Sequence, residues 1–205
     1  MTEQLTIGEK QTLLRLAREA MECAISGKNL PPVNLDSLPP HLREKGASFV
    51  TLTIDNELRG CIGTLESYQP LAEDVREHAV AAALNDPRFL PVDKTELNRI
   101  RLEVSCLTAP HLLEYSSSAD LLTKLRPHVD GVILKSDQRR ATFLPQVWEK
   151  IPDPADFLDH LCAKISAPSD AWREIKLQVY IYQVEEFREL KDNITGSTTK
   201  LHNKR

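Results

Sequence analysis

Apolar residues recur at two different periods along the chain, and each period predicts a different kind of element. Between Leu13 and Ile25 they return every three to four residues, behind a T-x-x-E capping box at Thr6–Glu9, and Gly27 follows where a helix would end. A second stripe of this kind spans residues 71–83, directly after Pro70, which suits a first helical turn. The sequence therefore predicts two helices in its first 85 residues.

Strict alternation of apolar and polar residues marks the expected strands. They are predicted at 47–54, 58–65, 100–106, 131–135, 141–144 and 177–181. Asp55-Asn56-Glu57 supplies turn chemistry, so the first two strands form a hairpin, and the fourth and fifth form another. Pairs of neighbouring strands separated by helices lack the rhythm of a parallel α/β fold. The pattern predicts an α+β fold with a mixed, largely antiparallel sheet and flanking helices.

Shorter helical segments and irregular stretches fill the remainder of the chain. Capping residues predict helices at 117–125 and 153–165, and the segment 144–148 is also expected to be helical. Residues 28–46 contain four prolines and little periodicity, which indicates a surface loop. We expect one domain over residues 1–190 and a polar, disordered tail over 191–205.

Composition and charge exclude several classes of function. The chain has 205 residues, of which 41% are hydrophobic and 27% charged, as in an ordinary globular protein. A net charge of −4 and only 5% aromatic residues provide neither phosphate neutralisation nor stacking platforms, so nucleic acid is not an expected partner. No apolar run approaches the roughly 20 residues of a membrane span, and no signal-peptide pattern opens the chain. A cytoplasmic protein without a membrane partner is expected.

The four cysteines are isolated from one another in the sequence. Cys23, Cys61, Cys106 and Cys162 include no C-x-x-C pair, so reduced thiols are expected in place of a disulfide framework. The same spacing argues against a thiol-ligated zinc site, and no metal site is predicted. Cys106 lies in an alternating strand and is expected in the core.

The stretch Leu58-Arg59-Gly60-Cys61-Ile62-Gly63 concentrates two of the seven glycines, one cysteine and one arginine. A strand period of two places Glu57, Arg59 and Cys61 on one face and Leu58, Gly60 and Ile62 on the other. A cation beside a thiol favours the thiolate, which makes Cys61 a candidate nucleophile and Arg59 its stabiliser. The alternative is architectural: Cys61 is a small core residue, and Gly60 and Gly63 allow close approach of a helix or a ligand.

Other candidate residues carry a functional and a structural interpretation side by side. Asp86 and Arg88, around Pro87, either clamp a carboxylate or phosphate with an arginine fork, or hold a turn through hydrogen bonds from Asp86 to nearby amides. Gln146 is a possible polar residue of a ligand site. His78 lies on the apolar stripe of its helix and is expected to be a hydrogen-bonded core histidine. No residue is identified as the general base that a catalytic thiol needs.

Five blocks of the sequence, in this order, resemble the AMMECR domain family. They are Leu58-Arg59-Gly60-Cys61-Ile62-Gly63, Asn85-Asp86-Pro87-Arg88-Phe89, Glu103-Val104-Ser105-Cys106-Leu107-Thr108, Leu144-Pro145-Gln146-Val147 and the segment from Phe157-Leu158 to Cys162-Ala163-Lys164. The likeness covers about residues 10–190. Two departures, Leu90 after Phe89 and Ile165 after Lys164, leave the central cysteine untouched.

The resemblance implies a single module with two subdomains around a cleft near the hexapeptide. It also implies membership of the AmmeMemoRadiSam system, with Memo-like proteins of extradiol-dioxygenase type and radical-SAM proteins as partners. No reaction or cofactor follows from the family. Two functions stay open on these grounds: a thiol-dependent enzyme or enzyme subunit acting on a small molecule through Cys61, and a non-catalytic binding or scaffolding subunit.

Overall fold

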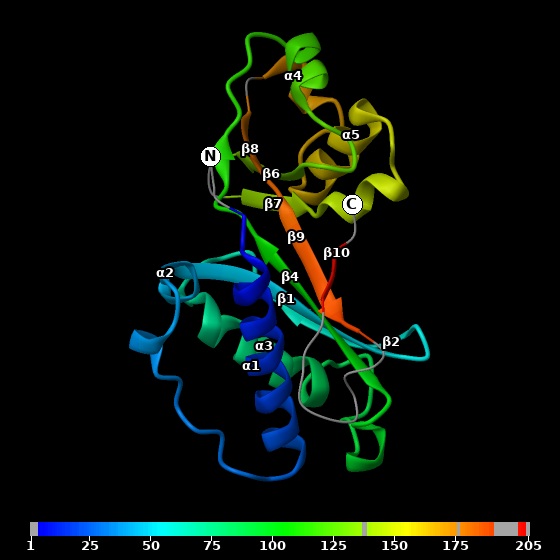
Figure 1. The fold of residues 1–205 in the computed structure, drawn as a ribbon. Coiled ribbons are helices and arrows are strands. Elements are labelled where there is room, and N and C mark those ends of the chain that lie inside the picture. The colour runs from blue at the N-terminus through cyan, green and yellow to red at the C-terminus, as the bar shows by residue number, and fades with distance from the viewer. Residues whose placement is uncertain (1–3, 137–138, 176, 191–200, 204–205) are drawn as a thin grey trace. The chain divides into compact units, whose positions relative to one another are not determined.

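Figure 1 presents the computed structural model, which describes residues 4–136, 139–175, 177–190 and 201–203. The chain divides into two compact units. Unit 1 contains the residues up to Leu107 together with those from Glu185 onward, and unit 2 contains Thr108–Val184. The predicted cleft between subdomains stays a prediction.

Unit 1 is built on a six-stranded sheet with the order β10-β9-β4-β1-β2, and β3 pairs with β1 beside this path. Its strands are β1 (Lys45–Ile54), β2 (Glu57–Gly63), β3 (Gln69–Pro70), β4 (Ile100–Leu107), β9 (Val184–Glu189) and β10 (Leu201–Asn203). The central strand β1 pairs antiparallel with β2, β3 and β4. Strand β2 lies at an edge of the sheet.

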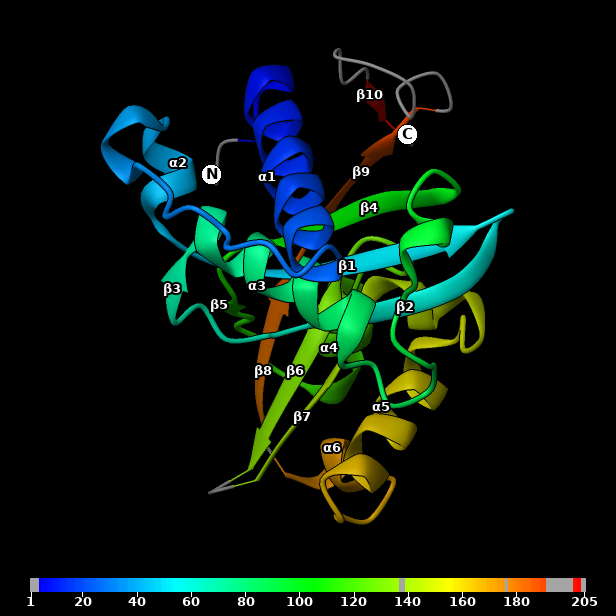
Figure 2. The same ribbon diagram turned by 90° about the horizontal axis from the view of Figure 1, so that it is seen from below.

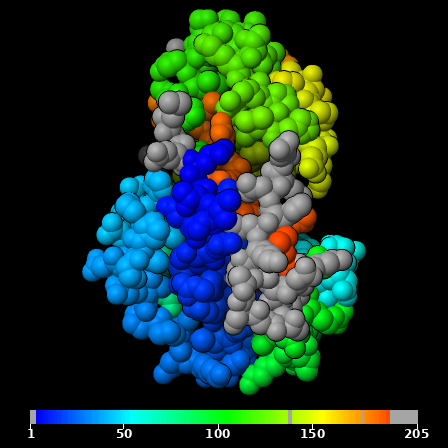
Figure 3. Space-filling view, in the orientation of Figure 1, coloured from blue at the N-terminus to red at the C-terminus, as the bar shows by residue number. Residues whose placement is uncertain are grey.

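Helices α1 (Ile7–Ile25) and α3 (Leu71–Leu84) pack on one face of this sheet, as Figures 1 and 2 show. Figure 3 shows α1 as a dark-blue band on the molecular surface, so its polar side is exposed. Thr6 and Glu9 form the predicted capping box. The segment between α1 and β1 contains the short helices η1 (Leu35–Ser37) and α2 (Pro40–Arg43). The core beneath the helices includes the fully buried Val50 and Leu52 of β1.

Unit 2 is a four-stranded antiparallel sheet with the order β5-β8-β6-β7 and helices around it. Its elements are β5 (His111–Leu112), α4 (Ser118–Lys124), β6 (Gly131–Ser136), β7 (Arg139–Phe143), η3 (Pro145–Glu149), α5 (Pro154–Lys164), α6 (Ala171–Glu174) and β8 (Gln178–Tyr182). Trp148 stacks on Phe157 with ring centroids 3.6 Å apart, and this pair forms the centre of a separate core.

The predicted α+β class with largely antiparallel sheets is confirmed. The strand predicted at 177–181 is present but is not the last, because β9 follows it and joins the sheet of unit 1. Charged residues mask β9 in the sequence, although Phe187 and Glu189 are buried in the structure. Of the predicted disordered tail, residues 191–200 and 204–205 lie outside the described residues, and Leu201–Asn203 forms β10.

Candidate functional site

The hairpin of β1 and β2 contains one extra residue at Arg59. Its turn is Asp55-Asn56, and both residues have positive φ, as a tight two-residue hairpin turn requires. Next to the turn Thr53 pairs with Leu58, but the following pair is Leu52 with Gly60. Arg59 therefore bulges out of the ladder, and the register beyond it is shifted by one residue.

The bulge decides which face of the sheet each residue of the hexapeptide occupies. Gly60 lies opposite the buried Leu52 and faces α3, whereas Cys61 lies opposite Thr51 on the other face. The predicted separation of Cys61 from Gly60 and Ile62 is correct. The predicted sharing of one face by Glu57, Arg59 and Cys61 is wrong, because alternation does not continue through a bulge and Leu58 takes the face of Cys61.

Gly60 allows helix α3 to approach the strand directly. A Cβ atom at Gly60 would lie 2.1 Å from the backbone oxygen of Ala82. Gly63 is equally restricted on the other face, where a Cβ atom would lie 2.4 Å from Cγ of the Phe49 ring. Both glycines therefore have a packing role, and their predicted role in ligand binding stays a prediction.

The Cys61 thiol is half-buried and has a polar neighbour on β1. The Thr51 Oγ1 hydroxyl donates a hydrogen bond to Cys61 Sγ over 3.3 Å. Across the next ladder, Thr51 pairs with Glu103 of β4. Cys61, Thr51 and Glu103 therefore form a row of side chains on one face of three adjacent strands.

Asp86 and Arg88 hold the backbone of Cys61 from the open edge of β2. The Cys61 amide donates to Asp86 Oδ2 over 2.8 Å, and Arg88 Nη2 donates to the Cys61 carbonyl over 3.1 Å. The two side chains also pair with each other, since Arg88 Nε and Nη2 donate to the Asp86 carboxylate over 2.9 and 2.6 Å. The structural interpretation of Asp86, a carboxylate bonded to nearby amides, is what the geometry shows. Asp86 and Arg88 therefore bond the backbone amide and carbonyl of Cys61 that would otherwise be unpaired at the edge of the sheet.

Arg59 makes a different fork, directed away from the strand ladder. Its Nε and Nη2 donate to the Glu96 carboxylate over 2.8 and 3.0 Å, and Nη1 donates to the carbonyl of Leu90 over 2.9 Å. Glu96 belongs to the short helix η2 (Lys94–Glu96) and accepts in addition from the Asp93 amide. Arg59 thus anchors the bulge to the segment after α3, and its predicted role as thiolate stabiliser stays a prediction.

The electrostatics of the two arginine pairs follow from these hydrogen bonds. Hydrogen bonds from Arg88 hold the pKa of the Asp86 carboxyl well below its usual range, although burial acts in the opposite direction. Asp86 in turn raises the pKa of Arg88, and an interaction with the Cys61 side chain adds to that rise. Likewise Arg59 lowers the pKa of Glu96. The cation that contacts Cys61 is therefore Arg88.

Two further predicted residues belong to other elements of the fold. Gln146 is exposed on η3 and belongs to unit 2. His78 is 5% exposed, and its Nδ1 lies 3.2 Å from Oδ2 of the buried Asp74, as expected for a hydrogen-bonded core histidine. Ser48 donates to the same Asp74 oxygen. Cys106 is 5% exposed, so its prediction as a core residue is confirmed.

Sequence reasoning missed Thr51, Glu96 and Glu103 as members of this region. Thr51 and Glu103 are found only through the strand register, and that register depends on the bulge. Glu96 had a local signal that was available, because Asp93-x-x-Glu96 is a capping box. Such a box indicates an ordered turn, but it does not indicate which arginine the glutamate meets.

The described residues show neither a metal centre nor a membrane span. Among them, no group of three or more His, Cys, Asp or Glu side chains is arranged to hold a metal ion. Nor does that part of the chain contain a helix with the length and apolar character needed to cross a membrane.

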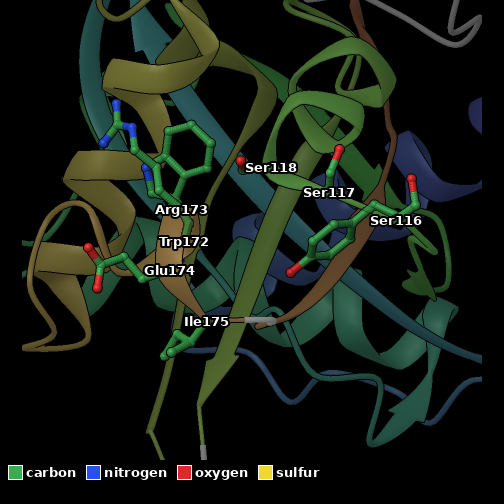
Figure 4. A pocket seen from close by; sticks show the side chains of 8 residues that line it. Ser116, Ser117, Ser118, Trp172, Arg173, Glu174 and Ile175 are labelled. Atoms are coloured by element: carbon green, nitrogen blue, oxygen red, sulfur yellow. The ribbon is translucent and has the colours of Figure 1, made fainter.

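Unit 2 contains a pocket of its own. Its volume is about 170 Å³, and it is lined by Tyr115, Ser116, Ser117, Ser118, Trp172, Arg173, Glu174 and Ile175. Figure 4 shows the three serines on one side of the pocket and the side chains of Arg173 and Glu174 on the other, directed away from the serines. Arg173 is paired with Asp159. None of the residues predicted from the sequence lines this pocket.

Comparisons with known proteins agree with the sequence motifs. Residues 14–187 match the family model described as AMMECR1. A relative from Methanococcus aeolicus is 37% identical over 194 residues, covering 93% of this chain and 96% of its own. Protein MK0488 of Methanopyrus kandleri is 38% identical and 92% of each chain is covered. Among solved structures, the uncharacterised protein PH0010 of Pyrococcus horikoshii is similar with a TM-score of 0.76, 33% identity and 98% coverage of both chains.

Proposed function

The chain belongs to the AMMECR1 family, and from that premise we propose that its function depends on the thiol of Cys61. In this proposal the chain is a cytoplasmic thiol-dependent enzyme or enzyme subunit. One observation carries it: Cys61 is a half-buried thiol that meets a hydroxyl donor, Thr51, and a cation, Arg88. A thiol at such a position, reachable from solvent and held beside polar groups, is a candidate nucleophile.

The placement of Cys61 by its backbone supports the same proposal. Because Asp86 and Arg88 bond both the amide and the carbonyl of Cys61, the strand position of the thiol is fixed independently of its side chain. Gly60 beneath Ala82 fixes it from the opposite face. A nucleophile held by surrounding structure needs little reorganisation before it reacts. Its reaction would form a bond from Sγ to an electrophilic carbon while the bond from that carbon to its leaving group breaks, and the thiol proton would pass to solvent.

Native labelling with iodoacetamide tests the reactive thiol. At neutral pH we expect Cys61 to be alkylated faster than Cys23. Cys23 lies on α1 and is also half-buried, so it is the internal control. Cys162 and Cys106 are buried, and desolvation raises the pKa of both thiols, so they should label last. If Cys61 labels only when the protein unfolds, a thiol-dependent function is excluded.

A scaffolding function is the second candidate, and a specific observation favours it. The glycines of the hexapeptide are explained by packing alone, since Cβ atoms at Gly60 and Gly63 would overlap backbone or ring atoms. In that function Cys61 is a packing residue, and Cys61→Ser leaves binding to partners unchanged. A protein whose Cys61→Ser variant retains all measurable function would be a binding or scaffolding subunit.

We also propose Memo-like proteins of extradiol-dioxygenase type and radical-SAM proteins as partners. Membership of the family supports this part of the proposal. Affinity purification of the intact chain from a native source, followed by mass spectrometry, tests it. Recovery of neither class of protein from a source that encodes both would remove these partners from the proposal.

A further inference from the structure

We propose that Arg88 is an anion-recognition residue, and that it holds a carboxylate or phosphate group of the molecule that reaches the Cys61 thiol. This inference deepens the proposed function and rests on it for the identity of the site. The inference is based on how many of the five N–H donors of Arg59 and of Arg88 already bond to protein acceptors. The donors of Arg88 are only partly occupied, whereas those of Arg59 are almost all occupied.

The hydrogen bonds of Arg59 leave it little capacity for a ligand. Nε donates to Glu96, Nη1 to the Leu90 carbonyl, and Nη2 to Glu96 and, over 3.4 Å, to the Pro91 carbonyl. The side chain is only 17% exposed. Arg59 is therefore a structural cation that holds the bulge, and an anion would have to displace protein acceptors to reach it.

Arg88 differs in both donors and exposure. Nε and Nη2 bond to Asp86 and to the Cys61 carbonyl, but Nη1 donates no hydrogen bond to any residue that the structure describes. The side chain is 54% exposed, while its partner Asp86 is 2% exposed. Since the bonded edges face a buried carboxylate, the free Nη1 edge is the one that solvent reaches. Arginine offers such an edge to carboxylate and phosphate oxygens.

The surroundings of the guanidinium fix its orientation in advance. Asp86 binds it in a fork, and the ring of Phe89 lies 5.5 Å from Arg88 Cζ. The Asp86 charge is shared among Arg88 and two backbone amides. The carboxylate that shares the sheet face with Cys61 is Glu103, across Thr51. Because Arg88 Nη2 also bonds the Cys61 carbonyl, an anion held by this guanidinium would lie next to residue 61.

The first measurement uses Cys61→Ser, so that it does not depend on thiol reactivity. Inorganic phosphate and, separately, acetate are titrated while the backbone amides of Cys61→Ser protein are followed by NMR. We expect saturable shifts at positions 61 and 88, and the stronger anion identifies which group the site prefers. Arg88→Gln should abolish these shifts, whereas Arg99→Gln, which removes an exposed cation paired with Asp55 in the same unit, should retain them.

The second measurement connects the anion to the thiol in the wild-type protein. Iodoacetate and iodoacetamide differ by one carboxylate, so the ratio of their rates at Cys61 reports a nearby anion site. Relative to the same ratio in the urea-unfolded chain, we expect an increase of about tenfold, the factor given by one charge-assisted hydrogen bond.

The outcomes separate the inference from the proposed function. Absence of saturable shifts with both anions, or shifts that persist in Arg88→Gln, overturns anion recognition by Arg88 whatever the thiol does. Anion binding together with a Cys61 that resists iodoacetamide supports recognition by Arg88 and overturns the thiol-dependent function. An unchanged rate ratio at a reactive Cys61 overturns the link between anion and thiol.

Discussion

The two faces of strand β2 differ at consecutive residues. On the face toward α3, Gly60 leaves no space even for a methyl group, because Ala82 O lies 2.1 Å from where a Cβ would stand. On the other face, Cys61 is half-buried and bonded to a threonine hydroxyl. Gly60 therefore has a packing role, whereas Cys61 presents a thiol. The architectural and chemical interpretations of the hexapeptide therefore apply to different residues and do not compete.

One inserted residue, Arg59, decides that Gly60 packs against the helix and that Cys61 presents its thiol on the opposite face. In a regular two-residue hairpin, continued from the pair Ile54–Glu57, Cys61 would lie opposite Val50 and face the core. The bulge at Arg59 shifts Cys61 opposite Thr51 and turns Gly60 toward the helix. The fork from Arg59 to Glu96 holds the bulge in place. The loss of one residue from this segment would exchange the two faces.

The largest effect is expected on the packed face. Gly60→Ala places a methyl group against the α3 backbone, and overpacking of this kind should lower the free energy of unfolding by about 3 kcal/mol or more. Gly8→Ala is the matched control, because nothing lies within 4 Å of its Cβ position, and it should raise stability by about 0.5–1 kcal/mol. Urea unfolding of both variants measures the contrast.

A substitution at Cys61, on the opposite face, should have little effect on stability. Cys61→Ser keeps an acceptor for Thr51 and should change the free energy of unfolding by less than about 1 kcal/mol. Equal losses in Gly60→Ala and Cys61→Ser would show that both faces are packed, and the distinction between them would be abandoned.

Loss of the Asp86 charge should have the next largest effect. Asp86→Asn replaces a carboxylate that accepts from Arg88 and from the Cys61 amide, and we expect a loss of about 2 kcal/mol in unfolding free energy. Glu96→Gln changes the corresponding partner of Arg59, whose carboxylate is 22% exposed, and should lose about half as much. Urea unfolding of the two variants at neutral pH tests the order. A larger loss in Glu96→Gln would make Arg59, not Arg88, the main anchor of the segment.

The pH dependence of stability tests the same carboxylate. Because Arg88 lowers the pKa of Asp86 in the folded state, the unfolded chain takes up a proton at this position first as pH falls. Its contribution is therefore complete above the unfolded pKa of about 3.9 and is lost as pH falls toward the lower folded pKa. The stability difference between wild type and Asp86→Asn should narrow from pH 5 to pH 2, measured by urea unfolding. A constant difference would contradict the lowered pKa.

The sequence predicted the elements of the fold better than their register. Helical period and capping located α1 and α3, and alternation located β1, β2 and β4, because these signals are local. Strand β9 was missed since its outward residues are charged and its burial depends on a distant sheet. Local periodicity does not report which strands become neighbours.

The candidate site shows the same limit more sharply. The hexapeptide and the Asp86–Arg88 segment were both identified, but the hydrogen bond between them was not. Arg88 reaches the Cys61 carbonyl because a strand edge leaves that backbone open to a residue 27 positions away. Thr51 could not be assigned to the site from the sequence, because its pairing with Cys61 depends on the register set by the bulge. Contacts made across strands and loops determine the chemistry here, and they follow from the tertiary fold.

The smallest expected effect isolates the hydroxyl on the open face. Thr51→Val removes the donor to Cys61 Sγ while keeping the shape and β propensity of the side chain, so stability should change by less than about 1 kcal/mol. Losing this weak hydrogen bond to sulfur should reduce the rate of iodoacetamide labelling of Cys61 at neutral pH by about threefold.

Thr53→Val is the matched control: it lies on the same face of β1 but pairs with Leu58, on the other side of the bulge. Because the two threonines differ chiefly in that register, a slower rate in Thr51→Val alone would locate the effect at the Cys61 contact. Equal rates in both variants and wild type would show that the hydroxyl does not affect the reactivity of the thiol.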